Sequence, residues 1–255
     1  AQVTVSGENF GAVGPGVIFY DDFDNGTSGA QLGAPEYGST WTFQSNAGVP
    51  RPYYDTELAY SGGLSAKVVF KDATFSPGYT INSFGGTNYG PINTAFISYR
   101  RYQNDTPNIS DASPYNMKQV YIWGPVDGGA CGAVGEHHIV PVVIGSGSNS
   151  WHSVSGSCPT VPAMYWGGPS YSDTEETWDR WDYYIDYEDD PADDDSRMMI
   201  WYNGDLSADV TTDMITYDGT QYVDDVRFGQ LHQNLDVLTS STVNYDDVYM
   251  SETMA

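Results

Sequence analysis

The sequence predicts an all-β fold, a single antiparallel two-sheet jelly-roll sandwich. The chain holds 21 Tyr, 9 Phe and 7 Trp, which favour strands, and 28 Gly and 14 Pro, which favour turns. No window shows a long apolar stripe at helical spacing. Residues 176–188 alternate instead, with Trp181 and Tyr183 on one face and Arg180 and Asp182 on the other. Many such strands in one chain of 255 residues are typical of two stacked sheets.

The first half of the chain begins with one short strand and a Gly-rich connection in residues 1–16. Five segments with strand character follow: 17–23, 41–45, 64–71, 94–104 and 117–125. Alternating apolar residues mark the third segment, where Leu64, Ala66, Val68 and Phe70 share one face. We expect segments 94–104 and 117–125 to form a central pair.

The second half continues the pattern: 136–145 and 150–156 as a hairpin, then 176–188, 197–210, 221–232 and 243–251. Asn203-Gly204 within the segment 197–210 fits a two-residue type I′ hairpin turn. The total is about 11 to 13 strands, with no linker and no second core. We therefore expect an N-terminal strand or extension over residues 1–16 and one jelly-roll domain over residues 17–255.

The charge of the chain excludes some partners. There are 34 acidic residues against 9 basic ones, a net charge of −25. Such a surface repels phosphate, so nucleic acid is excluded and an anionic membrane is disfavoured. No apolar run reaches the length of about 18 residues that a membrane-spanning helix needs. A saline extracellular setting would screen a charge of this size.

The two cysteines, Cys131 and Cys158, enclose 26 residues of Gly- and Ser-rich chain. Neither has a second Cys at the short spacing of a metal site, so a disulfide that closes this long loop is expected. A disulfide indicates an oxidising compartment. The opening "AQVTVSG" looks like a mature start after signal-peptide cleavage. We expect a secreted, extracellular or cell-surface protein.

A Tyr-Asp-Asp-hydrophobe motif occurs near both ends of the chain, in "IFYDDFDNG" from Ile18 and "VNYDDVYMS" from Val243. Adjacent carboxylates in a strand are costly unless solvent, a cation or a hydrogen-bond donor meets them. The first and last strands of a jelly roll can pair side by side. We therefore expect the two motifs to be neighbours and to share a cation.

The order of "IFYDDFDNGTSG", "ETWDRWDYYIDYE", "MIWYNGDL" and "VNYDDVYMS" resembles the concanavalin A-like lectin/glucanase (LamG-like) jelly rolls. In that superfamily a structural calcium often lies between the N-terminal loop and the last strand. The resemblance implies Asp22, Asp24, Asp246 and Asp247 as its ligands here. Carboxylate and carbonyl oxygens suit this hard cation.

The glucanases of that superfamily use the order Glu-x-Asp-x-x-Glu on one strand. The nearest match, Glu188 to Asp193, lacks the final Glu and contains Pro191, so glucanase activity is not expected. Lyases of this fold use Tyr or His as base and acid, and Arg, Gln or Lys against the uronate carboxylate. Residues 99–103 and 117–123, His138 and His232 supply these types, although the usual alginate-lyase motifs are absent.

A saccharide-binding face is the other expectation, because flat aromatic rings stack on sugars and polar side chains orient them. The candidate ligand-binding residues are Tyr99, Arg101, Tyr121, Trp123, His138, Trp151 and Trp166. Residues 162–173 look like a loop, and exposed aromatics there would indicate binding. No catalytic residue is assigned.

Three functions remain open. The first is a secreted, non-catalytic lectin-like protein that binds polysaccharide with calcium support. The second is a subunit of an extracellular filament or surface layer, in which residues 1–16 add a strand to a neighbouring copy. The third is a polysaccharide lyase that acts on a uronate polymer.

Overall fold

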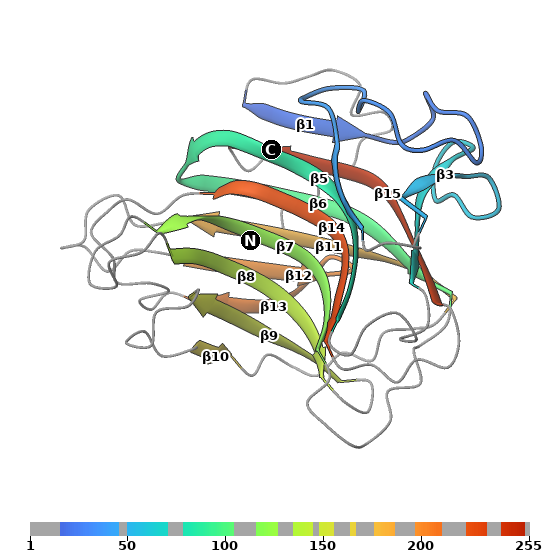
Figure 1. The fold of residues 1–255 in the computed structure, drawn as a ribbon. Helices are drawn as coiled ribbons and strands as arrows, with labels where there is room; N and C mark the ends of the chain where they lie inside the picture. The colour runs from blue at the N-terminus through green and yellow to red at the C-terminus, as the bar shows by residue number, and fades with distance from the viewer. Residues whose placement is uncertain are drawn as a thin grey trace.

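The computed structural model describes residues 16–45, 50–70, 79–104, 116–126, 135–144, 148–155, 164–166, 176–186, 197–210, 223–233 and 241–252. These residues form strands, turns and connections without a helix, in one eight-stranded and one seven-stranded antiparallel sheet. Figure 1 shows the sheets as curved, stacked layers. The predicted all-β, two-sheet jelly-roll sandwich is confirmed. The described part of the chain has no helix long and apolar enough to cross a membrane.

The eight-stranded sheet contains the last strand of the chain near its middle. Its order is β13 (Asp205–Val210), β12 (Arg197–Tyr202), β11 (Trp178–Asp186), β6 (Thr94–Gln103), β15 (Ser241–Ser251), β4 (Ser65–Phe70) and β3 (Tyr53–Asp55), and β1 (Val17–Asp21) also pairs with β15.

The seven-stranded sheet forms the other layer. Its order is β10 (Met164–Trp166), β9 (Ser148–Ser155), β8 (Gly135–Ile144), β7 (Asn116–Val126), β14 (Val223–Gln233), β5 (Tyr79–Ile92) and β2 (Thr42–Ser45).

The first and last described strands pair directly. Tyr20 lies opposite Tyr249 and Asp21 opposite Val248 in the antiparallel register of β1 with β15, and Figure 1 shows the two strands together at one side of the molecule. The prediction that the two Tyr-Asp-Asp motifs are neighbours is therefore confirmed.

Aromatic side chains fill the space between the sheets. The ring of Phe228 on β14 lies 5.5 Å from that of Phe84 on β5, and 5.4 Å and 5.9 Å from those of Tyr99 and Tyr245 on the other sheet. Its ring centroid is also 6.0 Å from that of Phe19 on β1. All five side chains are fully buried. Phe228 therefore joins both sheets and the first strand.

Most expected strands are present. The alternation in 176–188 becomes β11, with Trp181 and Tyr183 fully buried. The type I′ turn is confirmed as well, because Asn203 and Gly204 have φ values of 50° and 86°.

The expected central pair is wrong. β6 pairs with β11 and β15, whereas β7 pairs with β8 and β14 in the other sheet. Tyr99 on β6 and Val120 on β7 are both buried in the core, which they reach from opposite sheets. The two segments therefore lie in different sheets and do not pair with each other.

Three strands were missed by the sequence-based prediction: β3, β5 and β10. β5 contains Gly85, Gly86, Gly90 and Pro91, which weaken its strand signal. β10 lies within the segment expected to be a loop. Residues 1–15, Cys131 and Cys158 lie outside the described residues, so the N-terminal extension and the disulfide stay predictions.

Phe228→Ala tests the aromatic contact between the sheets. We expect it to lower the free energy of unfolding by about 3–5 kcal/mol, because it removes a fully buried ring and leaves a cavity. Urea denaturation measures this. Tyr37→Ala, at a side chain that is 40% exposed, is the control and should change stability by less than about 0.5 kcal/mol. Equal stability of both variants would contradict the proposed contact.

Candidate functional site

The first candidate site is the outer face of the seven-stranded sheet around Arg227, called the Arg227 face below. Val226 and Phe228 on β14 are buried in the core, so Asp225 and Arg227 lie on the outer face of the sheet. The Arg227 guanidinium donates from Nε to both Asp225 oxygens at 3.2 and 3.0 Å, and from Nη2 to Oδ2 at 2.8 Å. Their side chains keep only 11% and 6% exposure, so this is a fixed, largely desolvated ion pair.

A glycine on the neighbouring strand lets β5 approach the backbone of β14 closely at Arg227. Gly85 on β5 lies opposite Arg227. A Cβ atom at Gly85 would lie 2.1 Å from the Val226 carbonyl oxygen, 2.7 Å from the Arg227 Cα and 3.0 Å from its Cγ. The close approach of β14 at Arg227 thus requires a glycine at position 85, and that glycine weakens the strand signal of β5.

The backbone positions of three predicted ligand-binding residues lie next to Arg227 and Asp225 in the register of the sheet. Tyr121 on β7 is the cross-strand partner of Arg227, and Trp123 is the partner of Asp225 on one side and of His138 on the other. Their backbone positions form one continuous patch over β14, β7 and β8.

Trp151 and Trp166 occupy a different register. Trp166 pairs with Trp151, which pairs with Pro141. Pro141 is three residues from His138, so these positions fall on the opposite face of the sheet from Trp123 and His138. The register therefore separates Trp151 and Trp166 from the other candidates.

Tyr99 and Arg101 were wrongly predicted to face a ligand. Tyr99 is fully buried between the sheets, and its hydroxyl is 3.1 Å from that of Tyr183. Arg101 is 2% exposed, and its Nη2 donates to Oε1 of Gln103. The alternation of β6 turns both residues inward, so neither can contact a ligand on the surface.

Arg227 and Asp225 were themselves missed. They stand in "YVDDVRFG", which the sequence relates to the acidic end motifs. The available signal was their i, i+2 spacing, with the apolar residues Val226 and Phe228 on either side of Arg227. Since the chain has only 9 basic residues, Arg227 itself was a second signal that this segment could form a site.

The second candidate site is the group of acids where β1 meets β15. Asp246 is fully buried, and its Oδ2 accepts the N–H groups of Tyr60 and Ser61 at 2.7 and 3.1 Å. Asp24 Oδ1 likewise accepts those of Gly63 and Leu64 at 2.7 and 3.1 Å. Two of the four predicted calcium ligands thus bind the backbone of one loop, residues 56–64.

The remaining predicted ligands lie in a field of negative charge. Burial raises the pKa of Asp247, and the charges of Asp22 and Asp24 raise it further. Burial also raises the pKa of Glu36. The charge of Asp22 and a hydrogen bond between the two side chains raise this pKa further. Asp247 has a φ of 47° at the place where β15 shifts register against β6, and its Oδ1 accepts the Ser61 hydroxyl at 2.8 Å.

These acids do not form a ready cation cage. Within the residues that the structure describes, no group of three or more His, Cys, Asp or Glu side chains is arranged to hold a metal ion. As they lie, the oxygens of Asp24 and Asp246 fit backbone amides. Calcium binding at Asp22, Asp24, Asp246 and Asp247 stays a prediction.

The fold is similar to that of solved polysaccharide lyases. The endo-β-1,4-glucuronan lyase of the fungus Trichoderma reesei gives a TM-score of 0.59 at 12% identity, over 92% of this chain and 95% of that chain. The alginate lyase Aly36B gives 0.60 at 17% identity, over 93% and 97%. The binding domain of botulinum neurotoxin DC gives 0.55 at 12% identity, over 94% of this chain and 49% of that chain.

No protein-family model matches the chain, and no curated protein matches its sequence. At these identities the similar structures show the fold, which is the expected concanavalin A-like jelly roll.

Gly85→Ala tests the packing beneath the Arg227 face. The added methyl group must displace β14 backbone, so we expect a loss of about 1–3 kcal/mol in the free energy of unfolding. Gly63→Ala is the matched control, because a Cβ there meets nothing within 4 Å. If denaturation finds the two variants equally stable, the close approach of β5 to Arg227 is wrong.

Calcium is tested by its effect on the melting temperature. A cation would relieve the repulsion among Asp22, Glu36 and Asp247, so we expect excess calcium to stabilise the protein, by about 2.7 kcal/mol at a hundred times its Kd. Chelator should reverse the shift, and Asp22→Asn should reduce it. A melting temperature that ignores calcium would refute the prediction.

Proposed function

We propose that the chain is a polysaccharide lyase that cleaves a uronate-containing polymer on the Arg227 face. The observation that carries the proposal is the fixed Arg227 guanidinium, beside the positions of Tyr121, Trp123 and His138, on the outer face of the seven-stranded sheet. The fold shared with a glucuronan lyase and an alginate lyase over more than nine-tenths of the chain supports it.

Uronate cleavage by β-elimination needs three groups. A base removes the proton next to the carboxylate, a cation or amide neutralises that carboxylate, and an acid protonates the leaving glycosidic oxygen. Arg227 takes the second role in our proposal, because a guanidinium carries five N–H donors and Asp225 accepts only those on Nε and Nη2 in the hydrogen bonds described above. Asp225 orients it.

Tyr121 and His138 are our candidates for the proton transfers, since both residue types serve as base and acid. Tyr121 is the cross-strand partner of Arg227, and His138 lies one strand further, opposite Trp123. Trp123 supplies a ring on which a sugar can stack.

The net charge of −25 opposes binding of a polyanion. At the site itself Asp225 and Arg227 form a neutral pair, and salt screens the repulsion from the remaining acids beyond about 10 Å at 0.1 M. The proposal therefore implies that turnover rises from low to moderate ionic strength. An extracellular setting, as the composition indicates, fits this requirement.

Saccharide binding without catalysis is the second candidate. Cell entry of botulinum neurotoxin type C depends on interaction with two ganglioside molecules. The structure of that toxin matches this chain with a TM-score of 0.54, over 94% of this chain and 48% of the toxin chain. The filament alternative depends on residues 1–16 and stays a proposal. Both would leave the polymer intact.

Incubation with glucuronan or alginate tests the lyase, because each cut creates an unsaturated end that absorbs in the ultraviolet. The double variant D225N/R227Q replaces both buried charges by neutral amides, so no uncompensated charge remains. We expect it to reduce the rate by about a hundredfold or more.

Arg197→Gln is the control. Arg197 is 42% exposed and pairs with Asp209, and both residues lie in the eight-stranded sheet, away from the Arg227 face. It should keep the wild-type rate. Absence of an absorbance rise with the wild-type protein on both polymers would refute the lyase and leave saccharide binding as the better proposal.

A further inference from the structure

An aromatic patch with an arginine lies on the outer face of the eight-stranded sheet, away from the Arg227 face. It consists of Tyr60, Tyr102, Trp178 and Arg100, called the Tyr60 platform below. The Trp178 ring is 6.0 Å from that of Tyr60 and 5.5 Å from that of Tyr102. The Arg100 Cζ lies 4.0 Å from the Tyr60 ring centroid.

The platform belongs to the outer surface. On β6, Tyr99, Arg101 and Gln103 are buried, whereas Arg100 and Tyr102 lie on the other side of the strand. Trp178 on β11 is the cross-strand partner of Tyr102. Tyr60 comes from the loop 56–64 and is 46% exposed, although it is a large aromatic residue.

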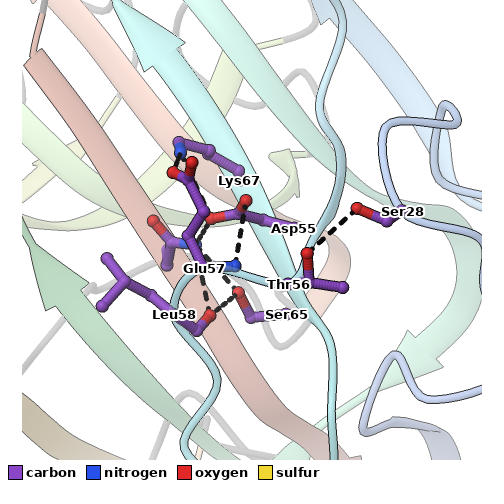
Figure 2. A network of polar contacts seen from close by, with 8 residues as sticks. Ser28, Asp55, Thr56, Glu57, Leu58, Ser65 and Lys67 are labelled. Carbon is purple, nitrogen blue, oxygen red and sulfur yellow. Dashed lines mark hydrogen bonds and ion pairs between the residues drawn. The ribbon is translucent and has the colours of Figure 1, made fainter.

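The loop that carries Tyr60 is held rigidly. Asp246 accepts the N–H group of Tyr60 itself, and Asp24 accepts those of Gly63 and Leu64. The start of the loop is held by Lys67 on β4, which forms ion pairs with Asp55 and Glu57 at 3.2 and 3.0 Å, shown in Figure 2. An exposed ring on a fixed backbone loses little conformational freedom when a ligand binds.

Arg100 gives the platform its charge. It lies directly opposite Arg180, although like charges on facing positions of a sheet repel. Arg180 is neutralised by Asp182 at 2.9 Å. Within the described residues Arg100 forms no ion pair at 4.0 Å or less, and its nearby acids, Asp247 and Asp182, act on it only at longer range.

We propose that the Tyr60 platform binds an acidic polysaccharide chain, independently of the Arg227 face. Rings of this kind stack on sugar faces, and the adjacent guanidinium can bind a uronate carboxylate. The guanidinium of Arg100 favours an anionic occupant over a neutral one, because no acid among the described residues pairs with it within 4.0 Å.

The two surfaces lie on opposite outer faces of the sandwich, so one polymer chain on the platform would leave the Arg227 face open to another. Holding the protein on a polymer network in this way raises the local concentration of substrate. The binding inference does not depend on the proposed activity, because it is measured without turnover.

The test is affinity electrophoresis in gels that contain glucuronan or alginate, with a neutral β-glucan gel as the polymer control. All proteins carry D225N/R227Q, so cleavage is slowed and any remaining binding at the Arg227 face is the same in every sample. We expect retention in the acidic gels, and an affinity about tenfold lower for Tyr60→Ala and for Arg100→Gln. Tyr37→Ala is the matched control, since its ring is also exposed, at 40%.

Circular dichroism and the melting temperature verify that each variant is folded, and Arg100→Lys serves as a second, charge-preserving variant that should bind more weakly than the parent. Unchanged retention of Tyr60→Ala would overturn the proposal. Equal retention in the neutral gel would overturn its acidic class. A change in sedimentation without a change in retention would assign the patch to contact with a second copy and would equally overturn it.

Discussion

Buried carboxylates must be met by donors, and this requirement organises the end of the sandwich where β1 and β15 pair. Asp21 is fully buried and accepts the Trp41 indole N–H at 2.8 Å and the Phe23 N–H at 2.9 Å, while burial raises its pKa to about 7. Burial, together with the charge of the neighbouring Asp247, raises the pKa of Asp246 to about 8. Since backbone N–H groups are the donors at Asp246, the acid dictates the course of the loop 56–64. The position of Tyr60 is a result of that demand.

The fold was predictable wherever one face of a strand is buried. β11 and the Asn203-Gly204 turn follow from alternation and turn chemistry alone. Sheet membership did not follow, because alternation says which residues face the core and not from which side. β5 was hidden for a different reason: Gly85 is dictated by the close approach of Arg227, a contact between segments about 140 residues apart that no local pattern carries.

The candidate site was only partly predictable. Tyr121, Trp123 and His138 were chosen as residue types suited to sugars, and the register brings their positions together. Tyr99 and Arg101 were chosen on the same grounds, but they point inward on β6. A buried arginine looks like a surface one in sequence, because its partner Gln103 and its burial are tertiary features. The adjacent acids in the sequence suggested a bound ion. In the structure, the carboxylate oxygens of Asp24 and Asp246 mainly accept hydrogen bonds from backbone N–H groups.

The antiparallel pairing of β1 with β15 also decides how the domain responds to pulling. Val17 lies opposite Ser251, and the Glu252 N–H donates to the Gly16 carbonyl at 2.8 Å. Any segments attached before Gly16 and after Glu252 therefore leave from the same end of one strand pair. Tension between two such attachments would open the hydrogen bonds one after another, like a zipper, rather than loading them all at once in shear. The aromatic core would begin to yield at Phe19, the residue of β1 that is buried in it.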